Sequence, residues 1–118
     1  MDVRLAEVES RFADLIWANE PLSSRKLAEL AEMELSWKKS TTYTVLKRLC
    51  QRGIFQNTGG TVTSLISKDS FFAVQSEQFV EQTFCGSLPA FLTAFGSRKK
   101  LSEGEVEELQ KIIESMRR

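Results

Sequence analysis

Residues 37–49 read WKKSTTYTVLKRL, and this pattern predicts an amphipathic helix. The apolar positions recur three and four residues apart, as on one buried helix face, and they are Thr42, Val45, Leu46 and Leu49. We expect the helix to cover residues 38–52, with Ser36 as its N-cap and Gly53 directly after its last turn. The opposite face presents hydroxyls, one aromatic ring and cations without a carboxylate, which suits phosphates and the edges of bases.

Two helices are expected before this stretch. The first covers residues 4–19, and its apolar face consists of Leu5, Val8, Phe12, Leu15 and Ile16. An extended Leu22 separates it from a second helix over residues 24–33, whose N-cap is Ser23 or Ser24. The second helix is short and charged on its outer face, which suits a support for the helix that follows it.

After Gly53 the apolar period changes from 3.6 to 2, which predicts strands. Two β-branched or aromatic runs lie at residues 54–57 and 61–66, and Thr58-Gly59-Gly60 joins them as a hairpin turn. Three helices followed by a hairpin is the order of a winged helix-turn-helix, in which the hairpin forms the wing. We therefore predict a mostly α fold with a small β-hairpin wing, and we assign residues 1–67 to a winged-helix domain.

Residues 68–118 are expected to form a second, entirely helical domain. Three helices begin near Ser67, Ser87 and Ser102, and the last of these forms a capping box with Glu105. The apolar face of the first helix consists of Phe72, Phe79, Val80 and Thr83. A segment of about 50 residues is marginally stable alone, so a second copy of the chain is expected to complete its core.

The homodimer is expected to form through apolar residues of the three C-terminal helices. These dimerisation residues are Phe79, Phe91, Leu92, Phe95, Val106, Leu109, Ile113 and Met116. The alternative is that the same helices fold back onto the N-terminal domain of their own chain.

The chain of 118 residues has 16 Lys and Arg, 16 Asp and Glu and no His, so its formal net charge is zero. A polycation that binds nucleic acid by bulk charge is therefore excluded, whereas a locally basic face is not. Residues 35–68, the acid-free block, hold six Lys or Arg and no acidic residue. We expect this block to bind double-stranded DNA through Lys39, Ser40, Thr41, Tyr43, Thr44, Lys47, Arg48 and, in the wing, Thr61.

Other interpretations of the acid-free block stay open. It also fits a solvated basic face with no partner, Tyr43 also fits a residue that packs on its helix neighbours, and Arg48 also fits a surface ion pair. The alternative function is a winged-helix adaptor that binds proteins and does not recognise a DNA sequence. Ser40 and Lys47 have the spacing of a Ser-Lys dyad, but no oxyanion-hole motif accompanies them, so an enzyme is not expected.

No catalytic, cofactor or metal site is expected. The absence of His excludes His-dependent hydrolysis and most zinc sites. Cys50 and Cys85 lie too far apart for a metal-binding pair and are too few for a disulfide-rich secreted domain. No apolar run reaches the roughly 20 residues of a membrane span, so we expect a cytoplasmic protein without membrane insertion. Cys50 is expected in the core; Cys85 is expected to be open to oxidation, which leaves a redox role open.

The stretch from Trp37 to Leu49 resembles the recognition helix of the penicillinase repressors, the BlaI/MecI/CopY family, with its pattern W-x-x-x-T-x-x-T-x-L-x-R-L. Arg52-Gly53 and the hairpin follow where that family has them. Residues 84–88 (FCGSL) are similar to the family's Gly-Ser-Leu turn between the first two C-terminal helices, and residues 101–109 are similar to the start of its last helix. The resemblance thus extends over almost the whole chain.

The resemblance implies a dimeric transcriptional repressor that binds a dyad operator. In the β-lactam-responsive members of the family, a membrane-bound sensor with a metalloprotease domain triggers cleavage of an Asn-Phe bond in the penultimate helix, which weakens the dimer and frees the DNA. By position that bond corresponds to Ala94-Phe95. Phe95 is kept and Ala94 stands in place of Asn, so release by proteolysis stays open. The paired C-x-C motifs of copper-responsive members are lacking, so copper sensing is not expected.

Overall fold

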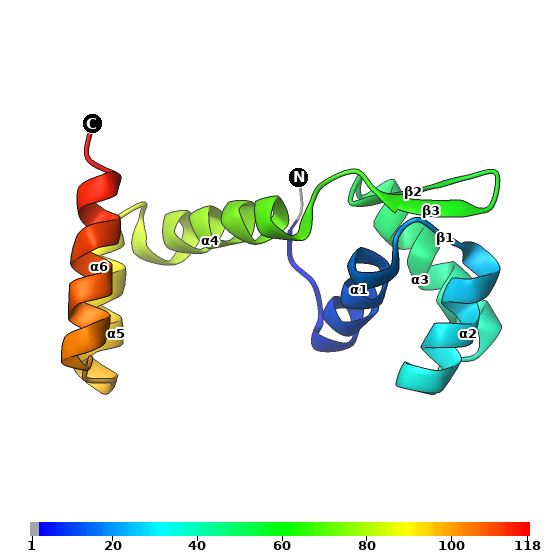
Figure 1. The fold of residues 1–118 in the computed structure, drawn as a ribbon, viewed down its shortest axis with the longest axis horizontal. Helices are drawn as coiled ribbons and strands as arrows, with labels where there is room; N and C mark the ends of the chain where they lie inside the picture. Colours follow the sequence, from blue (N-terminus) through cyan, green and yellow to red (C-terminus); the bar gives the residue numbers. More distant parts are fainter. Residues whose placement is uncertain (1–2) are drawn as a thin grey trace. The chain divides into compact units, whose positions relative to one another are not determined.

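The computed structural model describes residues 3–118, and the chain divides into two compact units, one ending at Ser76 and one beginning at Glu77. In chain order the elements (Figure 1) are α1 (Glu7–Asn19), β1 (Leu22–Ser23), α2 (Ser24–Leu35), α3 (Lys39–Gln51), β2 (Phe55–Thr58), β3 (Thr61–Ser64), α4 (Lys68–Phe84), α5 (Leu88–Arg98) and α6 (Glu103–Ser115). The predicted fold class, mostly helical with a β-hairpin wing before the C-terminal helices, is confirmed. Within residues 3–118, no helix is long and apolar enough to cross a membrane.

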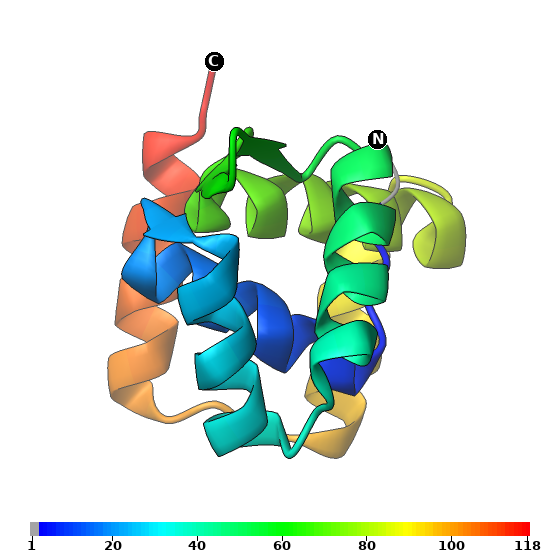
Figure 2. The ribbon, with the colours of Figure 1, turned by 90° about the vertical axis from the view of Figure 1, so that its right-hand side faces the viewer.

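The core of the N-terminal unit lies between α1, α2, α3 and the sheet (Figure 2). The predicted apolar stripe of α3 is confirmed, because its four residues are buried: Thr42, Val45, Leu46 and Leu49. α1 and α2 contribute Phe12, Ala13, Ile16, Leu27, Ala28 and Ala31. The Trp17 ring links the elements, with its centroid 5.2 Å from that of Phe55 and 5.4 Å from that of Phe71. This packing fixes α3 by one face and leaves its other face to the solvent.

The predicted hairpin is confirmed, and a third strand joins it. Strands β2 and β3 pair in antiparallel register from Phe55 opposite Ser64 to Thr58 opposite Thr61. Gly59 and Gly60 form the two-residue turn with φ of 59° and 87°, a backbone that residues with a Cβ rarely adopt. The short strand β1 adds to β3, where the sequence indicated only an extended Leu22.

Two details of the helix ends differ from the predictions. α1 begins at Glu7 instead of residue 4, and Val8, expected on its buried face, is 45% exposed. Ser36 does not cap α3, because it ends α2 in the left-handed conformation at φ 56°, and Lys38 is the N-cap of α3. The expectation of a cap at Ser23 is confirmed, since its side chain accepts a hydrogen bond from the Lys26 amide.

Phe71, and not Phe72, is the residue of α4 that enters the N-terminal core. Phe71 is fully buried, whereas Phe72, which was predicted on the apolar face of this helix together with Phe79, Val80 and Thr83, is 41% exposed. Neighbouring residues are about 100° apart around a helix, so a modest rotation decides which of the two rings is buried. Because of Phe71, the compact N-terminal unit includes the first turns of α4, while the predicted division of the domains lay at residue 67.

The C-terminal unit consists of the second half of α4 together with α5 and α6. The predicted capping box of α6 is confirmed: Ser102 Oγ accepts from the Glu105 amide and Glu105 Oε1 accepts from the Ser102 amide, both at 3.2 Å. The Phe91 ring contacts those of Phe79 and Phe84 edge to face, at centroid distances of 6.1 and 5.6 Å. These contacts hold α5 on α4, yet neither α5 nor α6 contains a fully buried residue.

Candidate nucleic-acid interface

The exposed face of α3 carries the side chains that were predicted to bind DNA. Every predicted residue of this helix is exposed: Lys39, Ser40, Thr41, Tyr43, Thr44, Lys47 and Arg48. They lie together because the opposite side of the helix is held in the core by the buried stripe. Tyr43 is only 38% exposed, so its ring lies partly against its neighbours, as the packing interpretation expected.

The hydroxyl of Thr44 is oriented by its own helix. Its Oγ1 donates to the Ser40 carbonyl oxygen at 2.9 Å. A hydroxyl has one proton, so the Thr44 oxygen remains available to accept a hydrogen bond but not to donate a second one. The methyl group of Thr44 is a suitable contact for the methyl group of thymine.

The wing presents a polar surface at its tip. Thr61 is exposed and pairs with Thr58 across the turn, and both lie within the acid-free block. Gln56 Nε2 donates to Thr63 Oγ1 at 3.1 Å, which ties the side chains of the two strands together. The wing therefore offers hydroxyl and amide groups that can contact a sugar-phosphate backbone.

Two cations of the acid-free block are paired with carboxylates of α1. Arg48 Nη1 lies 3.2 Å from Glu9 Oε2, and Lys68 Nζ lies 3.0 Å from Asp14 Oδ1. The surface ion pair that was an alternative for Arg48 is thus present. The partners of the first pair are 39 positions apart in the sequence and those of the second pair are 54 positions apart. A count of charges along the sequence therefore does not reveal either pair.

The other four cations of the block differ in whether their side chains have a partner within the protein. The Arg52 guanidinium donates to the backbone carbonyl of Arg4, in the segment before α1. Glu32 lines the same shallow depression as the start of α3, but it forms no ion pair with a lysine there. Among residues 3–118, three cations of the block have no ion-pair partner: Lys38, Lys39 and Lys47.

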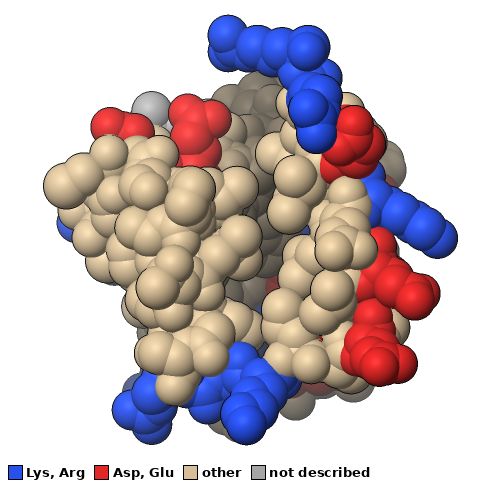
Figure 3. Space-filling view, turned by 90° about the vertical axis from the view of Figure 1, so that its left-hand side faces the viewer, with Lys and Arg blue, Asp and Glu red and all other residues tan. Residues whose placement is uncertain are grey.

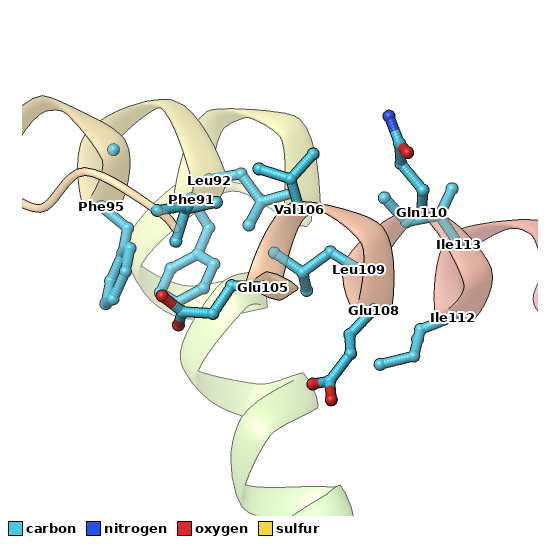
Figure 4. Close-up of a pocket in the computed structure, with 12 residues that line it drawn as sticks. Phe91, Leu92, Phe95, Glu105, Val106, Glu108, Leu109, Gln110, Ile112 and Ile113 are labelled. Atoms are coloured by element: carbon cyan, nitrogen blue, oxygen red, sulfur yellow. The ribbon is translucent and has the colours of Figure 1, made fainter. Parts of the chain in front are cut away.

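An apolar groove of about 510 Å³ lies between α5 and α6 (Figure 4). Six predicted dimerisation residues line it: Phe91, Leu92, Phe95, Val106, Leu109 and Ile113. Leu101 and Ile112 also line it and were not among the predicted residues, although Ile112, next to Ile113, widens the apolar seam of the last helix. In the view of Figure 3, uncharged surface lies at the centre of the face, and Lys, Arg, Asp and Glu side chains lie around its edge.

Two predicted dimerisation residues do not line the groove. Phe79 is half exposed, and its ring contacts that of the groove residue Phe91 edge to face. Met116 is the C-cap of α6 and is 64% exposed, beyond the last turn that lines the groove.

The Ala94-Phe95 bond lies inside α5, and both side chains are exposed. Phe95 lines the groove, so the bond belongs to the same surface as the predicted dimerisation residues. Cys85 is exposed at the end of α4, while Cys50 is half-buried against the core, and this burial raises the pKa of its thiol. Within residues 3–118 no group of three or more His, Cys, Asp or Glu side chains could hold a metal ion.

The chain is similar in sequence to known proteins along almost its whole length. The model of the family described as Penicillinase repressor matches residues 5–115. The methicillin resistance regulatory protein MecI of Staphylococcus aureus (strain Mu50) is 25% identical over 96% of this chain and 98% of its own length. The penicillinase repressor of Bacillus licheniformis is 24% identical over 94% of this chain and 90% of its own length. The chain therefore belongs to the penicillinase repressor family, whose members are regulatory proteins and not enzymes.

Proposed function

We propose that the protein is a dimeric transcriptional repressor that binds a dyad operator in double-stranded DNA. The observation that supports this most directly is the exposed face of α3, where hydroxyls, a phenol ring and lysines lie together without a carboxylate. In this proposal residues 1–67 bind the operator and residues 68–118 dimerise. The membership of the chain in a family of repressors supports the same function.

The side chains of α3 divide by chemistry into two roles. Thr41, Tyr43 and Thr44 contact base edges or the thymine methyl group in the major groove. Lys39, Ser40 and Lys47 bind phosphates, which fixes the register of the helix on the duplex but reads no sequence. Thr61 of the wing adds a backbone contact beside them.

A second copy of the chain is the partner that the α5–α6 groove fits. The groove is apolar, and a monomeric protein rarely exposes a large contiguous apolar surface. A two-fold interface uses the same patch on both chains, and the seam of α6 offers such a patch. The two recognition helices then meet half-sites one helical turn apart, about 34–36 Å, or a multiple of that distance.

Selection from random duplexes tests this function. The full chain is incubated with a random-sequence library, and bound DNA is amplified and sequenced through several rounds. We expect an inverted repeat to be enriched. Enrichment of no sequence would overturn the proposal and favour the protein-interaction adaptor.

A matched pair of variants then tests the role of α3. Thr44 and Thr93 are both exposed helical threonines whose Oγ1 donates to the carbonyl four residues earlier at 2.9 Å. Thr44→Val is expected to weaken operator binding about 5- to 150-fold or to change the preferred base at one position of each half-site. Thr93→Val, in α5, is expected to change neither. Equal effects of both variants would contradict the assignment of α3 as the recognition helix.

Release by proteolysis is a further part of the proposal. Cleavage between Ala94 and Phe95 would separate Phe95 and all of α6 from the rest of the groove, so the dimer would dissociate. The test is mass spectrometry of the protein from cells treated with a β-lactam. A fragment that ends at Ala94 is expected, whereas intact protein in cells that have induced the regulated gene would exclude this route.

A further inference from the structure

The carboxylates of α1 divide the cations of the acid-free block into two groups. Glu9 holds Arg48 and Asp14 holds Lys68, whereas Lys38, Lys39 and Lys47 have no ion-pair partner within residues 3–118. We infer that Glu9 is a positioning residue that withholds Arg48 from DNA phosphates, and that the three unpaired lysines supply the phosphate contacts. This inference rests on the proposed function and specifies the electrostatic part of its DNA interface.

Loss of the ion pair with Arg48 is expected to cost more free energy at Glu9 than at a fully exposed carboxylate. Its side chain is only 17% exposed, while that of Arg48 is 54% exposed. Its other oxygen accepts from the Ala6 amide at 3.1 Å and so completes the N-terminal cap of α1. Movement of Arg48 to a phosphate would leave a mostly buried carboxylate without its cation, which is unfavourable.

Lys68 is restrained in a second way. Its ammonium lies 3.0 Å from Asp14 Oδ1 and also 5.8 Å from the centroid of the Phe72 ring. Both charged side chains of this pair are half exposed, so the pair is weaker than that of Glu9 with Arg48.

The three lysines give up no ion pair when they bind a phosphate. Lys38 and Lys39 lie at the first turn of α3, whose N-terminal amides favour an anion, and Lys47 lies two turns further along its exposed face. Lys38 and Lys39 can therefore bind a phosphate at the N-terminal end of α3, and Lys47 can bind another along its exposed face.

The number of available cations sets how steeply the affinity for DNA falls with salt concentration. Each phosphate neutralised contributes about −0.9 to the slope of log K against log salt. Three available cations in each of two chains therefore predict a slope of about −5, whereas all six cations of the block would give about −11. The two values are far enough apart to be separated by a titration at several salt concentrations.

The experiment compares neighbouring residues of α3 in the full chain. Binding to a duplex is measured between 50 and 200 mM salt for wild type, Lys47→Gln and Arg48→Gln. Lys47→Gln is expected to make the slope shallower by about 1.8 for a dimer, so that its affinity falls about 12-fold less than that of wild type over this range. Arg48→Gln is expected to leave the slope unchanged. Equal changes in the two variants would overturn the inference.

The complementary variant is Glu9→Gln, with Glu7→Gln as its control. Both substitutions remove one negative charge from the first turn of α1, but only Glu9 contacts Arg48. Glu9→Gln retains an oxygen for the Ala6 amide and frees Arg48, so the slope is expected to become steeper by about 1.8. An equal change in Glu7→Gln, or no change in Glu9→Gln while its circular dichroism spectrum is native, would overturn the role of Glu9.

The wild-type measurements separate this inference from the proposed function. Phosphate contacts also govern binding to DNA of any sequence, so the slopes can be compared on a random duplex. If wild type binds all duplexes equally, sequence-specific repression fails while the order of the variants still tests the inference. If wild type binds no duplex, both fail.

Discussion

Replacement of Ile113 by Asp is expected to dissociate the proposed dimer and leave the folded chain intact. Ile113 lines the groove and is 51% exposed in the single chain, so its loss opens no cavity in a packed core. Complete burial of an isoleucine side chain contributes about 1.5–3 kcal/mol, and covering the exposed half in a dimer therefore contributes about 1 kcal/mol per copy.

The substitution acts twice, because a two-fold interface contains the same residue from both chains. Lost apolar burial weakens the dimer by about 2 kcal/mol. Two carboxylates placed in an apolar groove without partners add at least about 2 kcal/mol more. The sum corresponds to a dimer weakened about a thousandfold or more.

Sedimentation equilibrium over a range of protein concentrations measures this change. Wild type is expected to sediment as a dimer at micromolar concentration, and Ile113→Asp as a monomer. The variant is also expected to bind a full dyad no more tightly than a single half-site. The circular dichroism spectrum should stay helical in both proteins.

The control is Val8→Asp, which places a carboxylate at an aliphatic residue of similar exposure in the N-terminal unit. Val8 lies on α1 and is not one of the residues that line the groove, so its substitution should leave the dimer unchanged. A dimerisation constant of Ile113→Asp within threefold of wild type would refute the assignment of the groove. Dissociation by Val8→Asp as well would show that added negative charge, and not the groove, controls association.

Four smaller predictions test the packing, the capping and the thiols. Phe71→Ala is expected to destabilise the N-terminal unit by about 3–5 kcal/mol, which urea unfolding followed by Trp fluorescence measures, because the buried ring contacts Trp17. Ser102→Ala removes the capping box of α6 and is expected to cost about 1 kcal/mol of helix stability, seen as lower helicity on heating. Iodoacetamide is expected to alkylate the exposed Cys85 before Cys50, whose pKa is raised by burial. The pKa of the Cys50 thiol is higher in the folded state than in the unfolded state. Its contribution to stability is therefore complete below about pH 8.5 and is lost as the pH rises further. Urea unfolding midpoints of wild type and Cys50→Ala, compared across this pH range, measure the effect.

Local patterns in the sequence were sufficient to predict every helix and both strands of the hairpin, but not β1. The stripe of α3 repeats at helical spacing and is buried throughout, and the Gly59-Gly60 turn has the positive φ values that its hairpin needs. β1 was missed because a two-residue strand has no period of its own and exists only through its pairing with β3. The choice between Phe71 and Phe72 could not be made for a similar reason, because it depends on where Trp17 lies.

The candidate site was predictable in its composition but not in its electrostatics. The sequence indicated which side chains share the exposed face of α3, since that follows from helical spacing. It could not show that Glu9 contacts Arg48, because the two residues meet only after α1 and α3 pack. Charge counted along the chain therefore overestimates the number of cations that are free to bind phosphates.

The ion pairs between cations of the acid-free block and carboxylates of α1 also affect how such a repressor would dissociate from DNA. With three available lysines, one chain would release about three counterions, and a dimer about twice as many. If all six cations of the block were free, a single chain would release as many counterions as the proposed dimer with three available lysines in each chain. Dissociation of that dimer would then leave each chain strongly attracted to the duplex. Joining two half-sites can raise affinity by about 10²–10⁴ without any new contact. We therefore infer that the carboxylates of α1 keep each half of the repressor weak, so that binding depends on the groove between α5 and α6 being covered by a second copy.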